Sequence, residues 1–259
     1  MGMQGNLLAG RHALITGGGT GIGAAIARAL AGEGAWISLV GRRKEPLEQV
    51  ARSLPKAAAI TADITEQKDC EAMVASAHKA AGQIDIVIAN AGAADSAPAA
   101  KITADHWRRM IDVNLTGAFL TVQAALADVT RKDGGRGRRI VFTASTAGLK
   151  GYPYVAAYVA AKHGVVGLAR ALAAELAPTG VTVNAVCPGF TDTPLLDASA
   201  AAVSAKTGRS RDDARAALAK DNAGGRLMTP EEVAAKVLWL CSPAADAVNG
   251  EAILIGDRA

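Results

Sequence analysis

The stretch HALITGGGTGIGAAIARAL (residues 12–30) places a short apolar run, a glycine cluster and an alanine-rich segment in direct succession. The run His12–Thr16 has the length of a buried strand, and Gly21–Ala31 has the composition of a helix. Glycine lacks a Cβ, so the turn between them can be tight, and its N–H groups and the helix dipole can hold a pyrophosphate. The stretch therefore predicts a strand–turn–helix unit that binds a dinucleotide.

The same alternation of apolar runs and alanine-rich stretches continues along the chain. Continuously apolar strands separated by helices are typical of a parallel sheet covered on both faces, with right-handed crossovers. We predict the α/β class, with a single doubly wound Rossmann domain over residues 1–259 and seven parallel strands. The strands are expected at His12–Thr16, Ala35–Val40, Ala57–Thr61, Ile84–Ala89, Arg139–Ala144, Val181–Val186 and Ala252–Ile255, and the helices at Gly21–Ala31, Pro46–Ser53, Glu66–Ala80, Ala104–Asp128, Tyr154–Leu176 and Pro230–Leu240.

One segment departs from this rhythm. Thr193–Arg226 lies between the sixth strand and the last helix, and it is longer than an ordinary connection. We expect a helical lid over a substrate site there (193–226). After it, Thr229-Pro230-Glu231-Glu232 has the pattern of a capping box and predicts where the last helix begins.

The composition excludes several classes of protein. Half of the 259 residues are hydrophobic and 20% are charged, which excludes a disordered chain and leaves room for one large domain or two small ones. The three cysteines, Cys70, Cys187 and Cys241, are far apart and support neither a disulfide framework nor a zinc knuckle. With no long apolar run and no secretory leader, we expect a cytoplasmic protein with no membrane partner.

The formal net charge of +4 and the pI near 9.0 are weak signals of an anionic partner. The densest basic run is Arg131–Arg139, where five of nine residues are Lys or Arg. The run also carries Gly134, Gly135 and Gly137, and it lacks the aromatic residues on which nucleic-acid bases stack. We interpret it as a solvated loop and expect no nucleic-acid partner.

The end of the second predicted strand bears on the choice of cofactor. An NAD-binding unit usually has Asp or Glu about 20 residues after the glycine turn, where it holds the ribose hydroxyls. This chain has Val40-Gly41-Arg42-Arg43 there. The planar Arg42 guanidinium matches a 2′-phosphate, so NADP(H) is favoured, with NAD(H) as the alternative cofactor and a merely solvated arginine as the competing interpretation.

Tyr158 and Lys162 stand four residues apart in a predicted helix that is otherwise apolar, so they share one face. Such a pair is also common in core packing, with the lysine stem extended to solvent. An ammonium at ~4 Å in an effective dielectric of ~20 supplies about 4 kcal/mol, which would lower a phenol pKa from ~10 to ~7. Tyr158 would then exchange a proton near neutral pH, as a general acid or base must.

With these and further motifs, the sequence resembles the short-chain dehydrogenase/reductase family. The resemblance covers about residues 10–256, and the pattern is most similar to 3-oxoacyl reductases and polyketide ketoreductases. The motifs stand in family order: Thr16-Gly-x-x-x-Gly-x-Gly23, Asn90-Ala91-Gly92, Asn114 within Asp112-Val-Asn-Leu-Thr-Gly117, Ser145, Tyr158-x-x-x-Lys162 and Pro188-Gly189-Phe-Thr-Asp-Thr193.

The resemblance implies a catalytic role for four residues. Tyr158 gives a proton to a carbonyl oxygen during reduction, or takes it from the alcohol during oxidation. Lys162 holds the nicotinamide ribose and lowers the phenol pKa. Ser145 hydrogen-bonds the carbonyl oxygen, and Asn114 maintains a helix kink and a water that relays protons. No metal is implied.

The resemblance also implies a cofactor-binding set. Asp63 is expected at the adenine ring, Thr193 near the carboxamide or phosphates, and Asn90 beneath the glycine turn. The whole expected set is Gly17, Gly19, Gly21, Ile22, Gly23, Arg42, Asp63, Ile64, Asn90, Gly92, Tyr158, Lys162, Pro188, Gly189, Thr191 and Thr193.

The implied reaction is NAD(P)(H)-dependent interconversion of a ketone and a secondary alcohol by hydride transfer, with a 3-oxoacyl-type or related carbonyl compound as substrate. Ala127 and Ala174 occupy the positions where fatty-acid reductases carry docking arginines, which counts against an acyl carrier protein. A coenzyme A thioester or a free ketone then fits better. Candidate contacts for coenzyme A phosphates, or else a solvated basic face, are Lys206, Arg209, Arg211 and Arg215.

Two other functions stay open at this point. One is a dehydrogenase of a 3-hydroxyacyl-CoA or a small cyclic alcohol that runs in the oxidative direction. The other, more remote, is a dinucleotide-binding sensor without catalysis. Family members are commonly tetramers, so the resemblance implies a homotetramer, with a dimer as the alternative.

Overall fold

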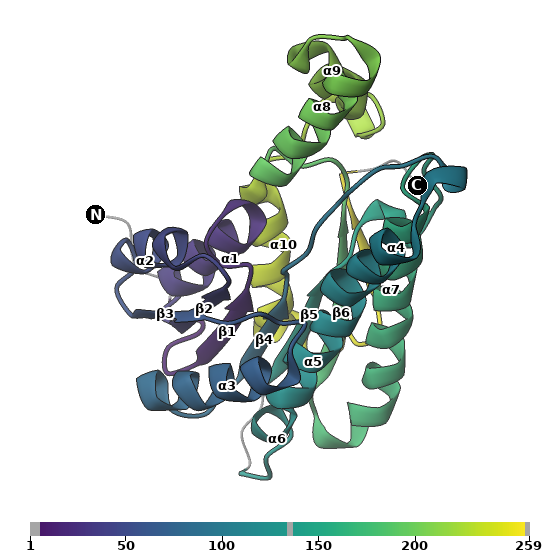
Figure 1. Ribbon diagram of the computed structural model, residues 1–259. Coiled ribbons are helices and arrows are strands. Elements are labelled where there is room, and N and C mark those ends of the chain that lie inside the picture. The colour runs from purple at the N-terminus through teal and green to yellow at the C-terminus, as the bar shows by residue number, and fades with distance from the viewer. Residues whose placement is uncertain (1–5, 134–136, 257–259) are drawn as a thin grey trace.

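The computed structural model describes residues 6–133 and 137–256 (Figure 1). Within these ranges the strands are β1 (His12–Thr16), β2 (Trp36–Gly41), β3 (Ala57–Thr61), β4 (Ile86–Ala89), β5 (Arg139–Thr143), β6 (Thr182–Pro188) and β7 (Ala252–Ile255). They form one parallel seven-stranded sheet in the order β3-β2-β1-β4-β5-β6-β7, which confirms the predicted fold class. The order reverses between β1 and β4, at the kind of switch point where open α/β sheets bind ligands.

The carboxyl ends of the central strands lie at one edge of the sheet. Thr16 of β1 is opposite Val40 of β2, and Ala89 of β4 is opposite Phe142 of β5. These strands are buried because helices cover both faces of the sheet. The loops that leave the four strand ends therefore converge, and they carry most of the predicted site residues.

Two layers of helices cover the sheet (Figure 1). Their bounds are α1 (Gly21–Gly32), α2 (Lys44–Arg52), α3 (Gln67–Ala81), α4 (Ala104–Ile111), α5 (Gly117–Ala124), α6 (Leu126–Val129), α7 (Ala156–Leu176), α8 (Pro194–Thr207), α9 (Arg211–Ala219) and α10 (Pro230–Cys241). On one face α1 and α10 bury Ile26 and Val237, and on the other α3 and α7 bury Met73 and Val165. None of the helices in the described ranges is long and apolar enough to cross a membrane.

One predicted helix is divided in the structure. The sequence predicts a continuous helix over Ala104–Asp128, but α4 ends at Ile111 and a π-helical turn, η2 (Asp112–Thr116), follows it. The Asn114 side chain donates to the carbonyl oxygen of Met110, the acceptor that its own N–H would use in an α-helix. Because this side-chain bond competes with the backbone, the helix widens at Asn114. A further break separates α5 from α6.

Helix α7 begins at Ala156, two residues later than predicted. Tyr154 has a φ of 66°, in the left-handed region that residues other than glycine rarely adopt. Its carbonyl oxygen accepts a 2.8 Å hydrogen bond from the N–H of Ala97, in the loop after β4. This contact between two loops keeps Tyr154 out of the helix.

The segment expected to be a lid is helical, as predicted. Helices α8 and α9 project beyond the sheet in Figure 1. Thr193 caps α8, since its side chain accepts from the N–H of Leu196. The predicted capping box at Thr229 and Glu232 is also present at the start of α10.

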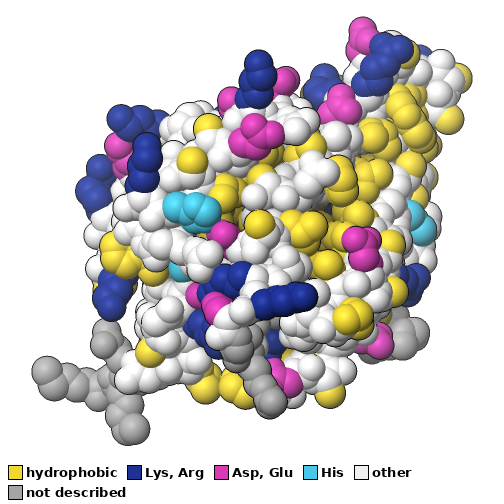
Figure 2. All heavy atoms as spheres, turned by 90° about the horizontal axis from the view of Figure 1, so that it is seen from below, with side chains coloured by type: hydrophobic (Ala, Val, Ile, Leu, Met, Phe, Trp, Pro, Cys, Tyr) yellow, Lys and Arg dark blue, Asp and Glu magenta, His cyan; other side chains and the backbone are white. Residues whose placement is uncertain are grey.

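Two arginines at the end of the basic run are buried, which corrects the sequence-based interpretation of the run as a solvated loop. The Arg138 and Arg139 side chains are only 4% and 3% exposed, and they pair with Asp133 and Asp246. Figure 2 shows basic and acidic side chains side by side on this underside of the molecule. Residues 134–136 of the run lie outside the described residues. For Arg139 the interpretation failed because Asp246, far along the chain, supplies the neutralising charge.

Candidate active site

The glycine turn joins β1 to α1 at the switch point. Gly17 and Gly21 have φ values of 68° and 52°, which glycine adopts without steric cost. A Cβ on Gly23 would lie 2.2 Å from the carbonyl oxygen of Gly17, so α1 can start this close to the turn only with glycine. Gly19 faces the start of α2, and Ile22 packs against the core. The turn therefore fits the pyrophosphate of a dinucleotide, with the start of α1 directed at it.

Asn90 fastens this turn to the end of β4. Its Nδ2 donates to the carbonyl oxygen of Thr16 at 2.9 Å. The N–H groups of Asn90 and Ala91 donate to Thr16 Oγ1 at 3.0 and 3.1 Å. A Cβ on Gly17 would lie 2.9 Å from Asn90 Nδ2, so the two predicted segments are in direct contact.

Tyr158 and Lys162 lie next to each other on α7. The Lys162 Nζ atom lies 5.7 Å from the centre of the Tyr158 ring and donates to the carbonyl oxygen of Thr143 at 2.8 Å. Lys162 is only 5% exposed. Its stem therefore does not extend to solvent, as the competing interpretation of the pair required.

Burial shifts the pKa of each group so that its neutral form is favoured. It lowers the pKa of Lys162 to about 8, because the ammonium loses its hydration. It raises the pKa of Tyr158, although a hydrogen bond with Ser145 acts in the opposite direction. The lowered phenol pKa expected from the sequence is therefore wrong for the chain by itself. The lost hydration outweighs the influence of Ser145.

Ser145 follows β5 and faces Tyr158. Its Oγ accepts a 3.1 Å hydrogen bond from the N–H of Ala147, and the same side chain is near enough to Tyr158 to act against the rise of the phenol pKa. Ser145 also caps the short 3-10 turn η3 (Thr146–Gly148). The turn fixes where the Ser145 hydroxyl stands, in the neighbourhood of the Tyr158 phenol.

Aromatic side chains gather beside these hydroxyls. All three tyrosines of the chain, Tyr152, Tyr154 and Tyr158, stand within seven residues. Tyr152 packs edge-on against Phe190, with ring centroids 5.9 Å apart, and its hydroxyl donates to Thr146 Oγ1 at 2.8 Å. The wall next to Ser145 is thus aromatic.

Asn114 is buried in the π-helical turn, 1% exposed. Its Oδ1 accepts from the N–H of Ala93 at 3.2 Å, and its Nδ2 donates to the carbonyl oxygen of Ala93 at 2.9 Å. A Cβ on Gly92 would lie 2.8 Å from Asn114 Oδ1 and 3.6 Å from Lys162 Nζ. Asn114, Gly92 and Lys162 therefore meet in space, as the motif order alone does not show.

Arg42 follows β2 and Asp63 follows the neighbouring strand β3, and the two side chains face each other. Arg42 Nη1 lies 3.9 Å from Asp63 Oδ2, and the Arg42 side chain is 71% exposed. Hydrogen bonds from Thr65 contribute more than Arg42 to the lowered pKa of Asp63. Ile64 is buried beside Gly117. The loose pairing leaves the Arg42 guanidinium open to a phosphate.

The segment after β6 reaches the glycine turn. Thr191 Oγ1 donates to the carbonyl oxygen of Gly189 at 3.0 Å, and Thr193 Oγ1 donates to that of Thr191 at 3.2 Å. A Cβ on Gly21 would lie 3.0 Å from Thr193 Cγ2. Pro188 ends β6 itself. The fold thus brings this last predicted segment to the same edge as the others.

Asn222 is a residue that the sequence reasoning missed. It follows α9, is 7% exposed, and its Oδ1 accepts a 2.8 Å hydrogen bond from the N–H of Phe190. Its partner is 32 residues away, so no local pattern marks the contact. The only signal in the sequence is an amide in the segment that returns from α9.

The basic residues of the lid segment differ in their contacts. Arg215 pairs with two aspartates at the base of the segment, and Lys206 donates to the carbonyl oxygen of Ser96 at 2.6 Å. Arg209 and Arg211 are exposed. Two of the four expected phosphate contacts are therefore engaged elsewhere.

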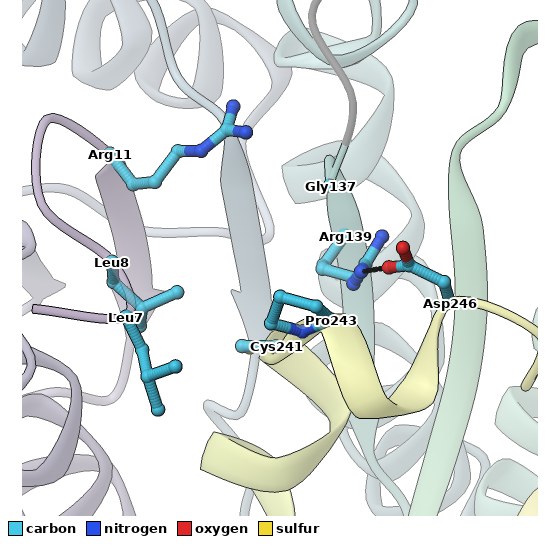
Figure 3. Close-up of a pocket in the computed structure, with 8 residues that line it drawn as sticks. All are labelled: Leu7, Leu8, Arg11, Gly137, Arg139, Cys241, Pro243 and Asp246. Atoms are coloured by element: carbon cyan, nitrogen blue, oxygen red, sulfur yellow. Dashed lines mark hydrogen bonds and ion pairs between the residues drawn. The ribbon is translucent and has the colours of Figure 1, made fainter.

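A surface depression at the opposite edge of the sheet contains none of the expected site residues (Figure 3). The Arg139 guanidinium there donates to the carbonyl oxygens of Leu240 and Ser242, and it pairs with Asp246. These bonds tie the edge of the sheet together. Within residues 6–133 and 137–256, no group of three or more His, Cys, Asp or Glu side chains could hold a metal ion.

Comparison with known proteins gives matches over nearly the whole chain. Residues 11–204 match the family model of the short chain dehydrogenases. D-beta-hydroxybutyrate dehydrogenase of Cupriavidus necator is 37% identical over 250 residues, which cover 94% of this chain and 95% of the relative. Cis-4-hydroxycyclohexanecarboxylate dehydrogenase of Sinomonas cyclohexanicum is 36% identical over 257 residues, 97% of each chain.

A solved structure agrees with these matches. The crystal structure of a variant of actinorhodin polyketide ketoreductase with NADPH has a TM-score of 0.90 and 35% identity, and the match covers 95% of both chains. The likeness therefore includes the glycine turn, β5 with Ser145, and α7 with its Tyr–Lys pair. The chain belongs to the short-chain dehydrogenase family, as an NAD(P)-dependent oxidoreductase that interconverts a ketone and a secondary alcohol.

Proposed function

We propose that Tyr158, Ser145, Lys162 and Asn114 carry the catalysis. The observation that supports this most directly is the buried Lys162 ammonium, which lies 5.7 Å from the centre of the Tyr158 ring, with Ser145 near enough to the phenol to act on its pKa. Two neighbouring hydroxyl groups can together hold a single carbonyl or alcohol oxygen.

Each of the four residues has a distinct task in this proposal. Tyr158 donates its proton to the carbonyl oxygen during reduction and takes it back during oxidation. Ser145 donates a hydrogen bond to the same oxygen. Lys162 holds the nicotinamide ribose, and Asn114 keeps the widened helical turn and the backbone of Ala93 in place. The nicotinamide, when bound, supplies or accepts the hydride.

The proposed dinucleotide site follows the converged loops. Gly17, Gly19 and Gly21 to Gly23 would hold the pyrophosphate, with Asn90 behind them. The remaining proposed contacts are Asp63 and Ile64 at the adenine, and Gly92, Tyr158, Lys162, Pro188, Gly189, Thr191 and Thr193 toward the nicotinamide.

We favour NADP(H) over NAD(H) because of the end of β2. Gly41 provides no carboxylate for ribose hydroxyls, and the exposed Arg42 guanidinium can receive a 2′-phosphate. Asp63 counts against this preference for NADP(H), because its carboxylate lies 3.9 Å from Arg42 and already offers the guanidinium a partner. The solved relative with NADPH supports the same choice.

For the substrate we propose a 3-oxoacyl-type or related carbonyl compound. Oxidation of a 3-hydroxyacyl-CoA or a small cyclic alcohol is the alternative, and the names of the hydroxybutyrate and hydroxycyclohexanecarboxylate relatives support it. A coenzyme A thioester loses some support because Arg215 and Lys206 already have partners. The aromatic wall of Tyr152 and Phe190 suits an apolar substrate body.

We further propose a homotetramer in the cytoplasm. Trp107 on α4, Phe119 on α5 and Trp239 on α10 are 43%, 39% and 37% exposed, an arrangement that suits contacts between subunits. Three free, buried cysteines fit a reducing compartment.

The experiment that tests the proposed function is a turnover assay. Purified protein is mixed with NADPH or NADH and a panel of 3-oxoacyl esters, their coenzyme A thioesters and cyclic ketones, and with the oxidised cofactors and the matching alcohols. We expect reduction of at least one ketone class, measured at 340 nm. Stoichiometric cofactor binding with no turnover across the panel would instead support a sensor.

A further inference from the structure

The side-chain amide of Asn222 is bonded entirely to backbone. Oδ1 accepts from the N–H of Phe190 at 2.8 Å. Nδ2 donates to the carbonyl oxygens of Phe190 and Arg226 at 2.6 and 2.9 Å. The residue is buried, so rotating the amide away would leave polar atoms without partners, at about 1–3 kcal/mol for each. Asn222 therefore binds both backbone polar groups of one residue, the N–H and the carbonyl oxygen of Phe190.

This contact extends a short pairing between the two ends of the lid segment. Thr191 and Met228 form a parallel bridge, in which Met228 donates to the carbonyl oxygen of Phe190 and accepts from the N–H of Asp192. The hydrogen bonds of Asn222 to Phe190 add a further link just before that bridge. A Cβ on Gly189 would lie 2.3 Å from Asn222 Oδ1, so the preceding residue leaves room for the amide only as glycine.

A continuous chain of contacts leads from Phe190 to the serine. The Phe190 ring meets Tyr152 edge-on at an interplanar angle of 88°. The Tyr152 hydroxyl donates to Thr146 Oγ1 at 2.8 Å, and Thr146, 3% exposed, directly follows Ser145. A shift of Phe190 would therefore release the ring that holds the turn after Ser145.

We propose that Asn222 is a positioning residue for Ser145, which acts through Phe190 and Tyr152. Asn222 fixes the backbone of Phe190, the Phe190 ring holds Tyr152, and Tyr152 holds the turn that carries Ser145. The inference rests on the proposed function, in which Ser145 touches the reacting oxygen. Displacement of such a group by about 1 Å can cost up to a hundredfold in rate.

The first test is Asn222→Leu, which keeps the side-chain size but removes both hydrogen-bonding atoms. We expect kcat to fall by about ten- to a hundredfold, with the dissociation constant of NADPH changed by less than about threefold. Asp221→Asn, at the exposed neighbouring position, is the matched control and should keep wild-type kinetics. A kcat of Asn222→Leu within twofold of wild type would overturn the proposal.

A second variant gives a pH signature that mere packing would not produce. In Asn222→Asp an oxygen replaces Nδ2 and faces the carbonyl oxygens of Phe190 and Arg226. The protonated carboxyl can still donate one of these bonds, whereas the ionised form is repelled. Relative to wild type, kcat should fall as the pH rises through the pKa of the new carboxyl. A ratio of variant to wild-type kcat that does not change with pH would contradict the proposed role.

A double-mutant comparison and amide hydrogen exchange test whether Asn222 acts on Ser145 through Tyr152. In a Tyr152→Leu background, Asn222→Leu should have a much smaller effect on kcat than in the wild type, whereas additive effects would exclude a route through Tyr152. The N–H of Phe190 donates to Asn222, and the N–H of Ala147 donates to Ser145 Oγ. Asn222→Leu should speed the exchange of both amides, as measured by NMR.

The exchange measurement needs no turnover, so the two proposals can fail separately. Faster exchange at Phe190 with unchanged exchange at Ala147 would overturn the link to Ser145, whatever the activity. Absence of turnover in the wild type would overturn the proposed function and leave the exchange result to decide the placement of Ser145.

Discussion

Lys162 donates a 2.8 Å hydrogen bond to the carbonyl oxygen of Thr143, the last residue of β5. This bond ties α7 to the strand that leads to Ser145, two residues further on. The distance between the lysine and the serine is therefore set by the sheet, before any dinucleotide binds. The ammonium remains buried among few polar atoms, which is why its pKa falls to about 8.

The buried lysine predicts an alkaline rise in stability. In the protein without cofactor, Lys162 loses its proton near pH 8, whereas the unfolded chain keeps it to about pH 10.5. The unfolded state then binds more protons, so the free energy of unfolding should rise from about pH 8 to 10, by on the order of 3 kcal/mol at most. Above pH 10 the raised pKa of Tyr158 acts in the opposite direction.

Urea unfolding of the wild type and Lys162→Met at pH 7 and 9.5 checks this expectation. Lys162→Met should be the more stable protein at pH 7 and should lose the alkaline rise. Lys220→Met, at an exposed position, is the control. Equal pH slopes for the wild type and Lys162→Met would show that the lysine is hydrated in solution.

Loss of the Tyr158 hydroxyl should abolish turnover. Tyr158→Phe removes the proton donor but keeps the ring against Lys162, so kcat should drop by more than about a hundredfold, the usual scale of general acid–base catalysis. NADPH affinity, measured by fluorescence titration, should stay within a few-fold. Tyr154→Phe changes the 66% exposed tyrosine nearby and serves as the control. Residual activity above about 1% would remove Tyr158 from the proposed mechanism.

The cofactor preference should follow the end of β2. A charge-assisted contact from Arg42 is worth about 1.5–3 kcal/mol, so the wild type should prefer NADPH by about ten- to a hundredfold in kcat/KM. Gly41→Asp should reverse the preference, and space exists for it, because a Cβ there meets only Leu47, at 3.6 Å.

Arg42→Met should reduce the NADPH preference, while Arg43→Met, the adjacent arginine, should leave it unchanged. Initial rates with the two cofactors at several concentrations provide the measurement. A wild type that already prefers NADH would mean that Arg42 stays with Asp63.

Stability should fall on mild acidification because of His12. The ring is 2% exposed and lies between the carbonyl oxygen of Gly82 and Ser38 Oγ, at 2.9 and 2.8 Å. Burial lowers the pKa of His12 below 6.5, so the unfolded chain takes up this proton first as the pH falls. The folded state is therefore destabilised progressively below about pH 6.5.

Melting temperatures of the wild type, His12→Gln and His106→Gln between pH 5 and 8 test this. His12→Gln should have a lower melting temperature at pH 8 but a shallower decline toward pH 5. His106→Gln in α4 should follow the wild type. An unchanged slope in His12→Gln would assign the acid sensitivity to other groups.

The proposed tetramer can be tested at one exposed aromatic residue. Light scattering at micromolar concentration should give four times the 26.2 kDa chain mass. Phe119→Lys places a charge on α5 and should give a smaller assembly, whereas Leu7→Lys at the exposed N-terminal turn should not. A monomer mass for the wild type contradicts the proposal.

The candidate site divides into residues that local pattern reveals and residues that it does not. Gly17 to Gly23 and the Tyr158–Lys162 pair can be found in the sequence, because a tight turn and one helical turn are short-range geometry. At Asn114 the residue pattern predicts an unbroken helix, because helical periodicity continues through the widened turn, and only the family resemblance implied a kink there. Asn222 escaped the sequence analysis because its partner, Phe190, is 32 residues away along the chain.

The sequence by itself determined the order of strands and helices, and with it the parallel sheet. Strands, turns and helices form from residues that are close together along the chain, so apolar runs and glycine turns reveal them. Tertiary structure alone decided how charge is distributed. Arg131 pairs with Asp85 at 2.6 Å across 46 residues, and Asn222 binds Phe190 across 32. The burial that sets the pKa values of Lys162 and Tyr158 is likewise the sum of contacts from several elements. Hydration and pairing depend on distance in space, and only the packed chain defines that distance.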